Sequence, residues 1–206
     1  MALTAFSLLG VLHGARASAA QALYHRVRYG AASGDLHRGL RLAEWAYRLD
    51  PHHYYLCIWA CRSAYETAVT VGGPDAEGWR AAAGRWCERG LALNPYKRQL
   101  RLIRARFIAR ASPADAARYW EEYLAWHFWD RENHAAMVEF YAKAGRLHEA
   151  MEQLTWLKGA DAEARARAAL RRVWQAEMDM GGTNGVAAGD AGLIPDAPRP
   201  QENSIR

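Results

Sequence analysis

The 206-residue sequence is poor in cysteine and proline, with three and seven residues, respectively. An odd and small number of cysteines does not form a disulfide framework, so disulfide bonds do not organise this chain. Neither sign of charge dominates, because 27 Lys and Arg residues stand against 22 Asp and Glu residues. The net charge of +5 is compatible with an acidic partner but does not require one.

Motifs that carry known chemistry are missing as well. The sequence has no Gly-rich phosphate loop, no His-Glu-x-x-His zinc motif and no nucleophile elbow of a hydrolase. The adjacent carboxylates Glu121 and Glu122 diverge on a helix, so they do not pair for acid–base work. We therefore expect a protein that is not an enzyme, with no catalytic residue and no cofactor.

One cluster has the chemistry of metal ligands. His53, Cys57 and Cys61 recur at i, i+4 and i+8, and both residue types bind zinc. A single straight helix presents them in a row, however, so a tetrahedral site needs a fourth ligand from elsewhere. Because cysteine also packs as a small apolar residue, we interpret Cys57 and Cys61 as core residues and predict no metal site.

A long hydrophobic run is also lacking. Residues 2–12 are apolar and uncharged, but crossing a bilayer core takes about 20 residues. Secretory signals begin with a basic region, which this run lacks, although Ala17-Ser18-Ala19 is typical of a cleavage site. Residues 1–19 are thus a cap helix, a signal or anchor, or part of a membrane span. A cytoplasmic and a membrane-associated, periplasm-facing location both stay open.

The chain does contain helical periodicity with repeated helix ends. Hydrophobic residues make up 51% of it and charged residues 24%, as in globular proteins. Leu49-Asp50-Pro51 and Leu93-Asn94-Pro95 each close a helical pattern, because proline lacks an N–H and clashes with the preceding turn. The spacing predicts helices over 4–32, 36–49, 53–71, 75–93, 96–111, 114–128, 131–144, 147–158 and 161–179.

These helices resemble the tetratricopeptide repeat (TPR), a helix–turn–helix unit of about 34 residues. Small residues and a late proline recur in it, and Gly39, Ala43, Ala46 and Pro51 follow that pattern in the first unit. The third unit lacks the closing proline. The second unit is longer than the others, and we place its additional residues in the turn around 71–75. The four units cover 20–53, 54–96, 97–130 and 131–164.

The resemblance implies an all-α fold, namely an α-solenoid of about four TPR-like helix–turn–helix repeats with N- and C-terminal capping helices. It also implies a non-catalytic scaffold or adaptor, which binds a peptide or protein partner in a concave groove lined by the first helix of each pair. The chain then divides into an apolar N-terminal segment (1–19), the repeat domain (20–164), a capping helix (165–180) and a disordered Gly- and Pro-rich tail (181–206).

The expected groove is partly basic. Arg98, Arg101 and Arg104 lie within one helix of the third unit, and arginine binds carboxylates through two parallel hydrogen bonds. A solvated basic face is the alternative interpretation of these arginines. Tyrosines and an arginine on the matching helices of earlier units would add contacts to the partner. The predicted partner-binding residues are Tyr24, Arg28, Tyr54, Tyr55, Arg98, Arg101 and Arg104.

The segment 119–129 is rich in aromatic residues. Trp120 and Tyr123 occupy packing positions of the repeat, whereas Trp126 and Trp129 project elsewhere on the helix. Exposed Trp and Tyr are typical anchors of interfaces, while neighbouring helices could equally cover them. Both interpretations stay open.

Two other functions remain as alternatives. An apolar N-terminus followed directly by repeats is similar to the repeat regions of some bacterial O-antigen ligase-like proteins. That similarity implies an envelope-associated domain serving polysaccharide or membrane-protein assembly. Residues 137–159 also look like one pentatricopeptide repeat, a family that binds RNA with one base per repeat. Because reading RNA takes several such repeats in series, we expect no nucleic-acid partner.

Overall fold

A computed structural model describes residues 2–30 and 35–181. Helices are the regular elements of these ranges, and no strand occurs there, so the predicted all-α class is confirmed. The predicted turn at Gly34 and the predicted tail from residue 182 onward lie outside the described residues. The elements are α1 (Ala2–Gly30), α2 (Leu36–Leu49), α3 (Tyr54–Val71), the 3₁₀ turn η2 (Pro74–Ala76), α4 (Glu77–Leu93), α5 (Arg98–Ala111), α6 (Pro113–Trp126), α7 (Arg131–Lys143), α8 (Leu147–Thr155) and α9 (Asp161–Gly181).

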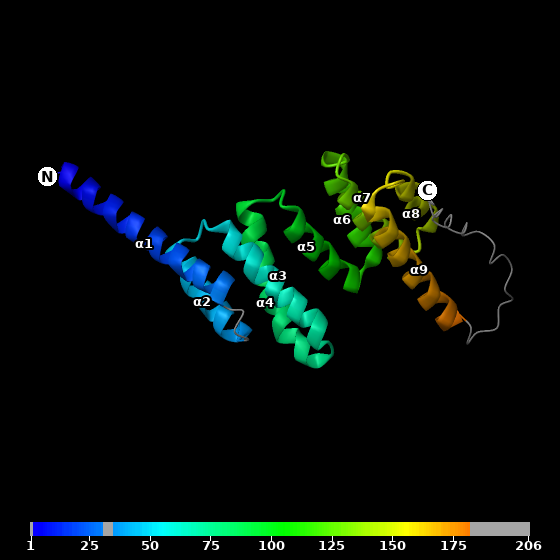
Figure 1. Ribbon diagram of the computed structural model, residues 1–206, viewed down its shortest axis with the longest axis horizontal. Coiled ribbons are helices and arrows are strands. Elements are labelled where there is room, and N and C mark those ends of the chain that lie inside the picture. Colours follow the sequence, from blue (N-terminus) through cyan, green and yellow to red (C-terminus); the bar gives the residue numbers. More distant parts are fainter. Residues whose placement is uncertain (1, 31–34, 182–206) are drawn as a thin grey trace, which may run out of the picture.

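Helices that are neighbours in the chain pack side by side along one elongated molecule (Figure 1). They pair as α1 with α2, α3 with α4, α5 with α6 and α7 with α8. The first helices of successive pairs also meet, since α5 contacts both α3 and α7, and α9 packs along α7. Each pair therefore buries its apolar side against adjacent pairs and not against a common centre.

The helix ends predicted from proline are confirmed. α2 stops at Leu49 and α4 stops at Leu93, directly before the Asp-Pro and Asn-Pro steps. α2 begins at a side-chain cap, because the Asp35 carboxylate accepts the Arg38 backbone N–H at 2.9 Å. Such a cap satisfies an N–H group that the first helical turn leaves unpaired.

Two helices end earlier than predicted. α6 ends at Trp126 instead of residue 128, and α8 ends at Thr155 instead of residue 158. After α6, Asn133 Nδ2 donates a hydrogen bond to the His127 carbonyl at 3.1 Å. Trp120 Nε1 in turn donates to the Asn133 carbonyl at 2.9 Å. These side-chain bonds satisfy the backbone of the α6–α7 turn without the proline that ends the first two units.

We placed the additional residues of the second unit in the turn around 71–75, but they lengthen both of its helices, in line with the predicted helix bounds 53–71 and 75–93. α3 has 18 residues and α4 has 17, whereas α2, α5 and α6 have 14 each. The turn between them is short and begins with Gly72 and Gly73, whose φ angles of 66° and 54° favour glycine. The α3–α4 hairpin therefore extends about one helical turn beyond its neighbours (Figure 1).

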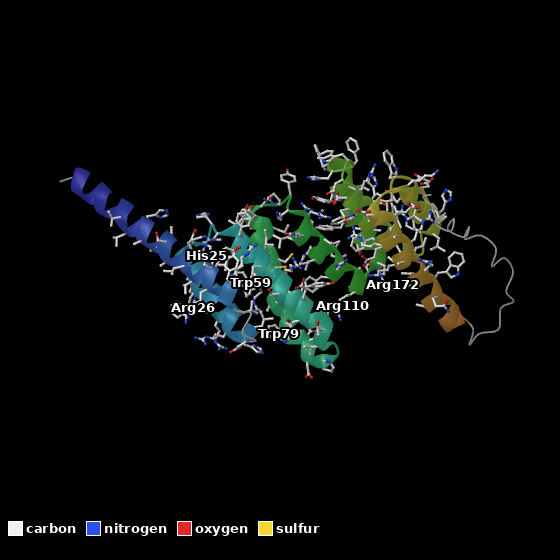
Figure 2. All side chains as sticks on the ribbon, in the orientation of Figure 1. His25, Arg26, Trp59, Trp79, Arg110 and Arg172 are labelled. Atoms are coloured by element: carbon white, nitrogen blue, oxygen red, sulfur yellow. The ribbon has the colours of Figure 1, made fainter. Side chains whose placement is uncertain are left out.

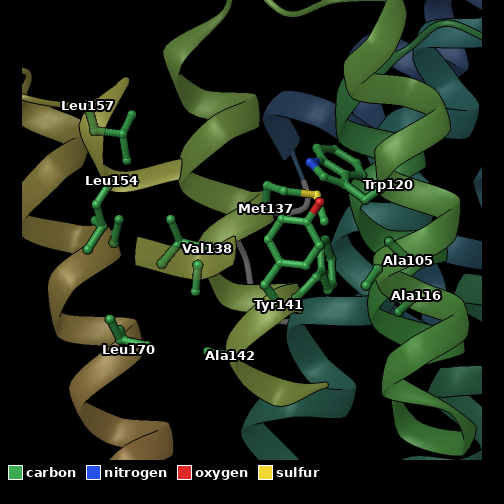
Figure 3. Close-up of a cluster of buried hydrophobic side chains, with 14 of the residues drawn as sticks. Ala105, Ala116, Trp120, Met137, Val138, Tyr141, Ala142, Leu154, Leu157 and Leu170 are labelled. Atoms are coloured by element: carbon green, nitrogen blue, oxygen red, sulfur yellow. The ribbon is translucent and has the colours of Figure 1, made fainter. Parts of the chain in front are cut away.

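Buried side chains form two main cores. The C-terminal core spans α5 to α9 and contains Trp120, Met137, Val138 and Leu157, all fully buried (Figure 3). The N-terminal core joins α1, α2, α3, α4 and the first half of α5. Both cores draw on α5, so this helix connects the two halves of the molecule.

The buried side chains among the described residues of α1 lie in its second half. Ala20, Tyr24 and Val27 are buried, but Val11 and Leu12 are 72% and 54% exposed. The apolar segment 1–19 is thus helical from Ala2, yet its described side chains cover little of the fold. No helix in the described part of the chain is both long enough and apolar enough to cross a bilayer.

Candidate functional site

The strongest candidate for a binding site is a hollow of about 370 Å³ between α3, α5 and α7, the first helices of three successive pairs. We call it the α3–α5–α7 pocket. Four of its ten lining residues are cationic, and Arg110 marks its position at the C-terminal end of α5 (Figure 2). The charged lining residues are Arg80, Arg106, Arg110, Lys143 and the single carboxylate Glu139.

The pocket forms where three helices end. α3 ends before Gly72, and α7 ends shortly before Gly145, whose φ of 72° likewise favours glycine. α5 ends before Ser112, and the following Pro113 starts α6 at the position where a helix tolerates proline. Local sequence therefore fixes where each helix stops, and the stacking of the pairs brings these ends together.

The floor of the pocket is apolar. The rings of Tyr65 on α3 and Phe107 on α5 meet edge to face, with centroids 5.7 Å apart and an interplanar angle of 87°. Ala68 and Val69 continue this lining along α3. Such an aromatic pair stabilises its packing by about 1 kcal/mol beyond burial, which favours this arrangement of the floor.

Glu139 on α7 holds two of the cations. Arg106 Nη2 donates to Glu139 Oε2 at 3.2 Å, and Lys143 Nζ donates to Glu139 Oε1 at 2.7 Å. Burial of the carboxyl opposes its ionisation, but the two cations outweigh burial, so the pKa of Glu139 lies below its usual value. Glu139 is therefore charged at neutral pH and links α5 to α7.

Arg80 and Arg110 retain unused hydrogen-bonding capacity. Arg80 Nη1 donates to Glu77 at 3.1 Å, but the Arg80 Nε is buried without a hydrogen-bond partner. A buried donor left unpaired costs about 1–3 kcal/mol. Arg110 is exposed and forms no ion pair with any described residue.

The charges of the lining do not cancel, because four cations surround one carboxylate. Each of the three helix ends contributes about half a negative charge, which also favours cations there. Together the three helix ends offset only about half of the excess positive charge of the lining side chains. An open cationic pocket with an aromatic floor is suited to a carboxylate that is attached to an apolar group.

Two of the arginines predicted for a basic groove are neutralised by ion pairs. The Arg98 guanidinium lies 3.8 Å from carboxylate oxygens of both Asp130 and Glu132, next to the start of α7. Arg104 Nη1 donates to Glu88 on α4 at 3.3 Å. Both arginines therefore link helices and do not present an open basic surface.

The third predicted arginine, Arg101, is held by the backbone and by α6. Its Nε donates to the Pro95 carbonyl at 2.6 Å, and its guanidinium lies 5.2 Å from the ring centroid of Tyr119. Tyr119 is half-buried, in contrast to the nearby Trp126, which is 74% exposed. The interpretation of Trp126 as an exposed aromatic residue is thus confirmed, whereas Tyr119 is partly covered.

The residues predicted from the first two units do not form one site with the arginines of α5. Tyr24 is a core residue, and its hydroxyl accepts a hydrogen bond from Arg28 at 2.6 Å, so its ring is not free for a partner. Tyr54 and Tyr55 lie at the start of α3 with ring centroids 4.0 Å apart, and Tyr55 is exposed. The α3–α5–α7 pocket lies at the other end of α3.

The predicted groove and the α3–α5–α7 pocket thus both involve α5, but they lie on different sides of it. Arg104 and Arg106 are two positions apart and project about 200° from each other around the helix. Arg104 points to α4, and Arg106 points to α7. The signal that could have found the pocket is the pair Arg106 and Arg110, four residues apart at the end of α5.

A larger hollow of about 510 Å³ lies between α2 and α4. Its cations Arg41 and Arg85 are matched by the carboxylates Glu44 and Asp75. The lining is therefore electrically balanced and offers no preference for a charged ligand, which leaves the α3–α5–α7 pocket as the better candidate.

The cysteines are core residues, as predicted. Cys57 and Cys61 are fully buried, and burial raises the pKa of Cys57 to about 11, so its thiol is uncharged at neutral pH. His53 caps α3 instead, because its Nδ1 accepts the Leu56 N–H at 3.3 Å. Within residues 2–30 and 35–181, no group of three or more His, Cys, Asp or Glu side chains is arranged to hold a metal ion.

No protein-family model matches this sequence, and no curated protein or solved structure matches it either. The TPR resemblance therefore depends on the residues of this chain alone. The candidate site has to be interpreted from its own geometry.

Proposed function

We propose that this protein is a non-catalytic, TPR-like scaffold that binds an acidic segment of a partner protein in the α3–α5–α7 pocket. The order of its helices supports the solenoid, because helix pairs follow one another and the first helices of successive pairs are in contact. A surface built in this way exists before the partner arrives, so binding costs little ordering of the scaffold.

The observation that carries the proposal is the surplus of cations above an apolar floor. A carboxylate of the partner would reach the exposed Arg110, and an adjacent apolar side chain would contact Phe107. Hydrogen bonds between a guanidinium and a carboxylate are about twice as strong as neutral ones. Glu139 competes with the partner for Arg106 and so limits the affinity.

Fluorescence anisotropy with the full chain and a labelled peptide of alternating Glu and Leu tests the proposal. Arg110→Glu replaces an unpaired cation by an anion, and we expect at least about fivefold weaker binding. Arg172→Glu makes the same charge change on an exposed residue of α9 and is the matched control, with unchanged affinity. Glu139→Gln should bind the peptide more tightly, because it releases Arg106.

Equal affinity of the parent chain and a folded Arg110→Glu variant would contradict the proposal. Equally tight binding of a single-stranded oligo-uridine of the same charge would also contradict it and would favour the RNA-binding alternative. Circular dichroism of each variant establishes that the helices are intact.

A further inference from the structure

Exposed aromatic side chains gather on one edge of the molecule. Of the eight exposed Trp, Tyr and Phe side chains among the described residues, six lie where the second helix of one pair turns into the first helix of the next. The opposite edge has one of the remaining two, Tyr29 at the end of α1. We call the six the aromatic edge: Tyr55, Tyr96, Trp126, Phe128, Trp129 and Trp156.

Rings from neighbouring turns contact one another along this edge. Tyr96, in the α4–α5 turn, has its centroid 6.2 Å from that of His127 in the α6–α7 turn. His127 lies 5.5 Å from Trp129, which meets Phe128 edge to face at 5.4 Å. The aromatic side chains of these two turns therefore form one continuous surface.

The α8–α9 turn extends the same surface. His134 Nε2 donates to the Phe128 carbonyl at 2.5 Å, and its ring stacks on Trp156 with centroids 5.1 Å apart. Trp156 is nevertheless 60% exposed. His134 thus holds the Trp156 indole beside the α6–α7 turn and leaves it exposed.

The free end of α1 projects from the same side of the molecule. Arg16 Nη2 donates to the Arg48 carbonyl in the last turn of α2, so residues 2–15 of α1 extend past the end of α2. At about 1.5 Å per residue this projection is roughly 20 Å long. Its first eleven residues, 2–12, contain no charged side chain. Figure 1 shows the N-terminus on the side where the α4–α5 and α6–α7 turns lie.

Charge does not explain the composition of this edge. Next to the aromatic rings, Arg98 lies 3.8 Å from carboxylate oxygens of Asp130 and Glu132, which neutralise it. Arg101 donates to the Pro95 carbonyl and does not extend to solvent as a free cation. These two arginines therefore add no free cation to the surface formed by the exposed rings.

We propose that the aromatic edge and the free end of α1 rest together on a lipid bilayer surface. Trp and Tyr combine an apolar ring with a polar N–H or O–H, and they concentrate at the level of lipid headgroups for this reason. An apolar helix segment can lie in the same interfacial layer without crossing the membrane. The two features lie far apart along the elongated molecule, and an extended flat apolar phase contacts both, whereas a compact protein groove covers one.

Sedimentation of the full chain with phosphatidylcholine vesicles tests this proposal. We expect binding that 0.5 M KCl does not displace, because burial of apolar rings and not ionic contact drives it. The triple variant Trp126→Ser, Phe128→Ser, Trp129→Ser should bind at least about tenfold more weakly, since it removes three exposed rings. Tyr29→Ser is the matched control, because Tyr29 is 64% exposed but lies on the opposite edge at the end of α1, and its binding should equal that of the parent.

A second variant tests the projection. Val11→Asp with Leu12→Asp places two charges on exposed positions of α1 and should also weaken vesicle binding about tenfold or more. Tryptophan quenching by brominated phosphatidylcholine gives an independent readout, and the quenching should fall in the triple variant.

Three results would overturn the proposal. The first is equal vesicle binding by the triple variant, and the second is binding only to phosphatidylglycerol vesicles that salt reverses. The third is a dimer in light scattering that the triple variant abolishes, with no vesicle binding by the parent. Arg110→Glu separates this proposal from the pocket, because it should weaken peptide binding and leave vesicle binding unchanged.

Discussion

At the scale of single residues, Gly90 shows how closely the helices of the second pair approach α5. A Cβ atom at this position would lie 2.5 Å from Leu100 Cδ1 and 3.1 Å from Cys57 Cβ. Leu100 and Cys57 are fully buried, so neither side chain has space into which to move. The absence of a side chain at Gly90 therefore sets the spacing of α3, α4 and α5.

Gly90→Ala should lower the free energy of unfolding by about 1–2 kcal/mol, because overpacking outweighs the gain in helix propensity. Gly84→Ala is the matched control on the same helix, where no atom lies within 4 Å of the added methyl group. It should raise the stability by up to about 1 kcal/mol. Urea denaturation of both variants, followed by circular dichroism, measures the difference, and stabilisation by Gly90→Ala would contradict this account of the packing.

At the scale of single elements, α5 is the helix whose surroundings the sequence does not determine. Its apolar residues Leu100, Ile103 and Phe107 identify a buried stripe, and they were sufficient to predict the helix and its bounds within two residues. Arginines occur on the other sides of α5, however, and periodicity alone does not predict which neighbouring helix each arginine will contact. Contacts with α4 and α7 decide that Arg104 forms an ion pair on one side and Arg106 lines the pocket on the other.

Helix ends differ in how well the sequence predicts them. Pro51 and Pro95 act through local chemistry, so the ends of α2 and α4 were predicted correctly. The end of α6 depends instead on hydrogen bonds of Trp120 and Asn133 from outside the turn itself. Such bonds exist only in the folded protein, which is why the prediction extended α6 two residues too far.

The link between α5 and α7 should make stability depend on pH. Since the pKa of folded Glu139 lies below its usual value of 4.5, its ion pairs stabilise the fold above about pH 4.5 and are lost as pH falls through the folded pKa. Glu139→Gln should therefore cost about 1 kcal/mol at pH 7 and progressively less toward pH 3. Urea denaturation at several pH values measures this difference, and a constant difference would contradict the assigned role of Glu139.

At the scale of the whole molecule, contacts between neighbours dominate, and the two cores share only α5. The all-α class and the order of the helices were predictable because each element carries its own start and stop signals. The pocket and the aromatic edge were not predicted as sites, because both arise from residues that lie in different pairs. Tyr55 was selected from the sequence, but as part of a groove and not of an edge.

A substitution in one core of this helix array should destabilise the helices of that core more than the others. Trp120→Ala removes a fully buried indole and its hydrogen bond to the Asn133 carbonyl from the C-terminal core. The cavity and the lost hydrogen bond should cost about 3–5 kcal/mol. Hydrogen exchange should accelerate in α6, α7, α8 and α9 while α3 and α4 remain protected. Equal acceleration along the whole chain would instead indicate one cooperative unit.

The longer hairpin of α3 and α4 shows which insertions this architecture tolerates. Compared with the 14-residue α5, α3 has four residues more and α4 has three more. Each addition is close to one helical turn of 3.6 residues and lengthens its helix by about 5 Å. The additional turns extend the hairpin at its tip and do not rotate the apolar stripes that pack against the adjacent pairs. The tip of a hairpin is therefore where this architecture can grow without repacking its neighbours.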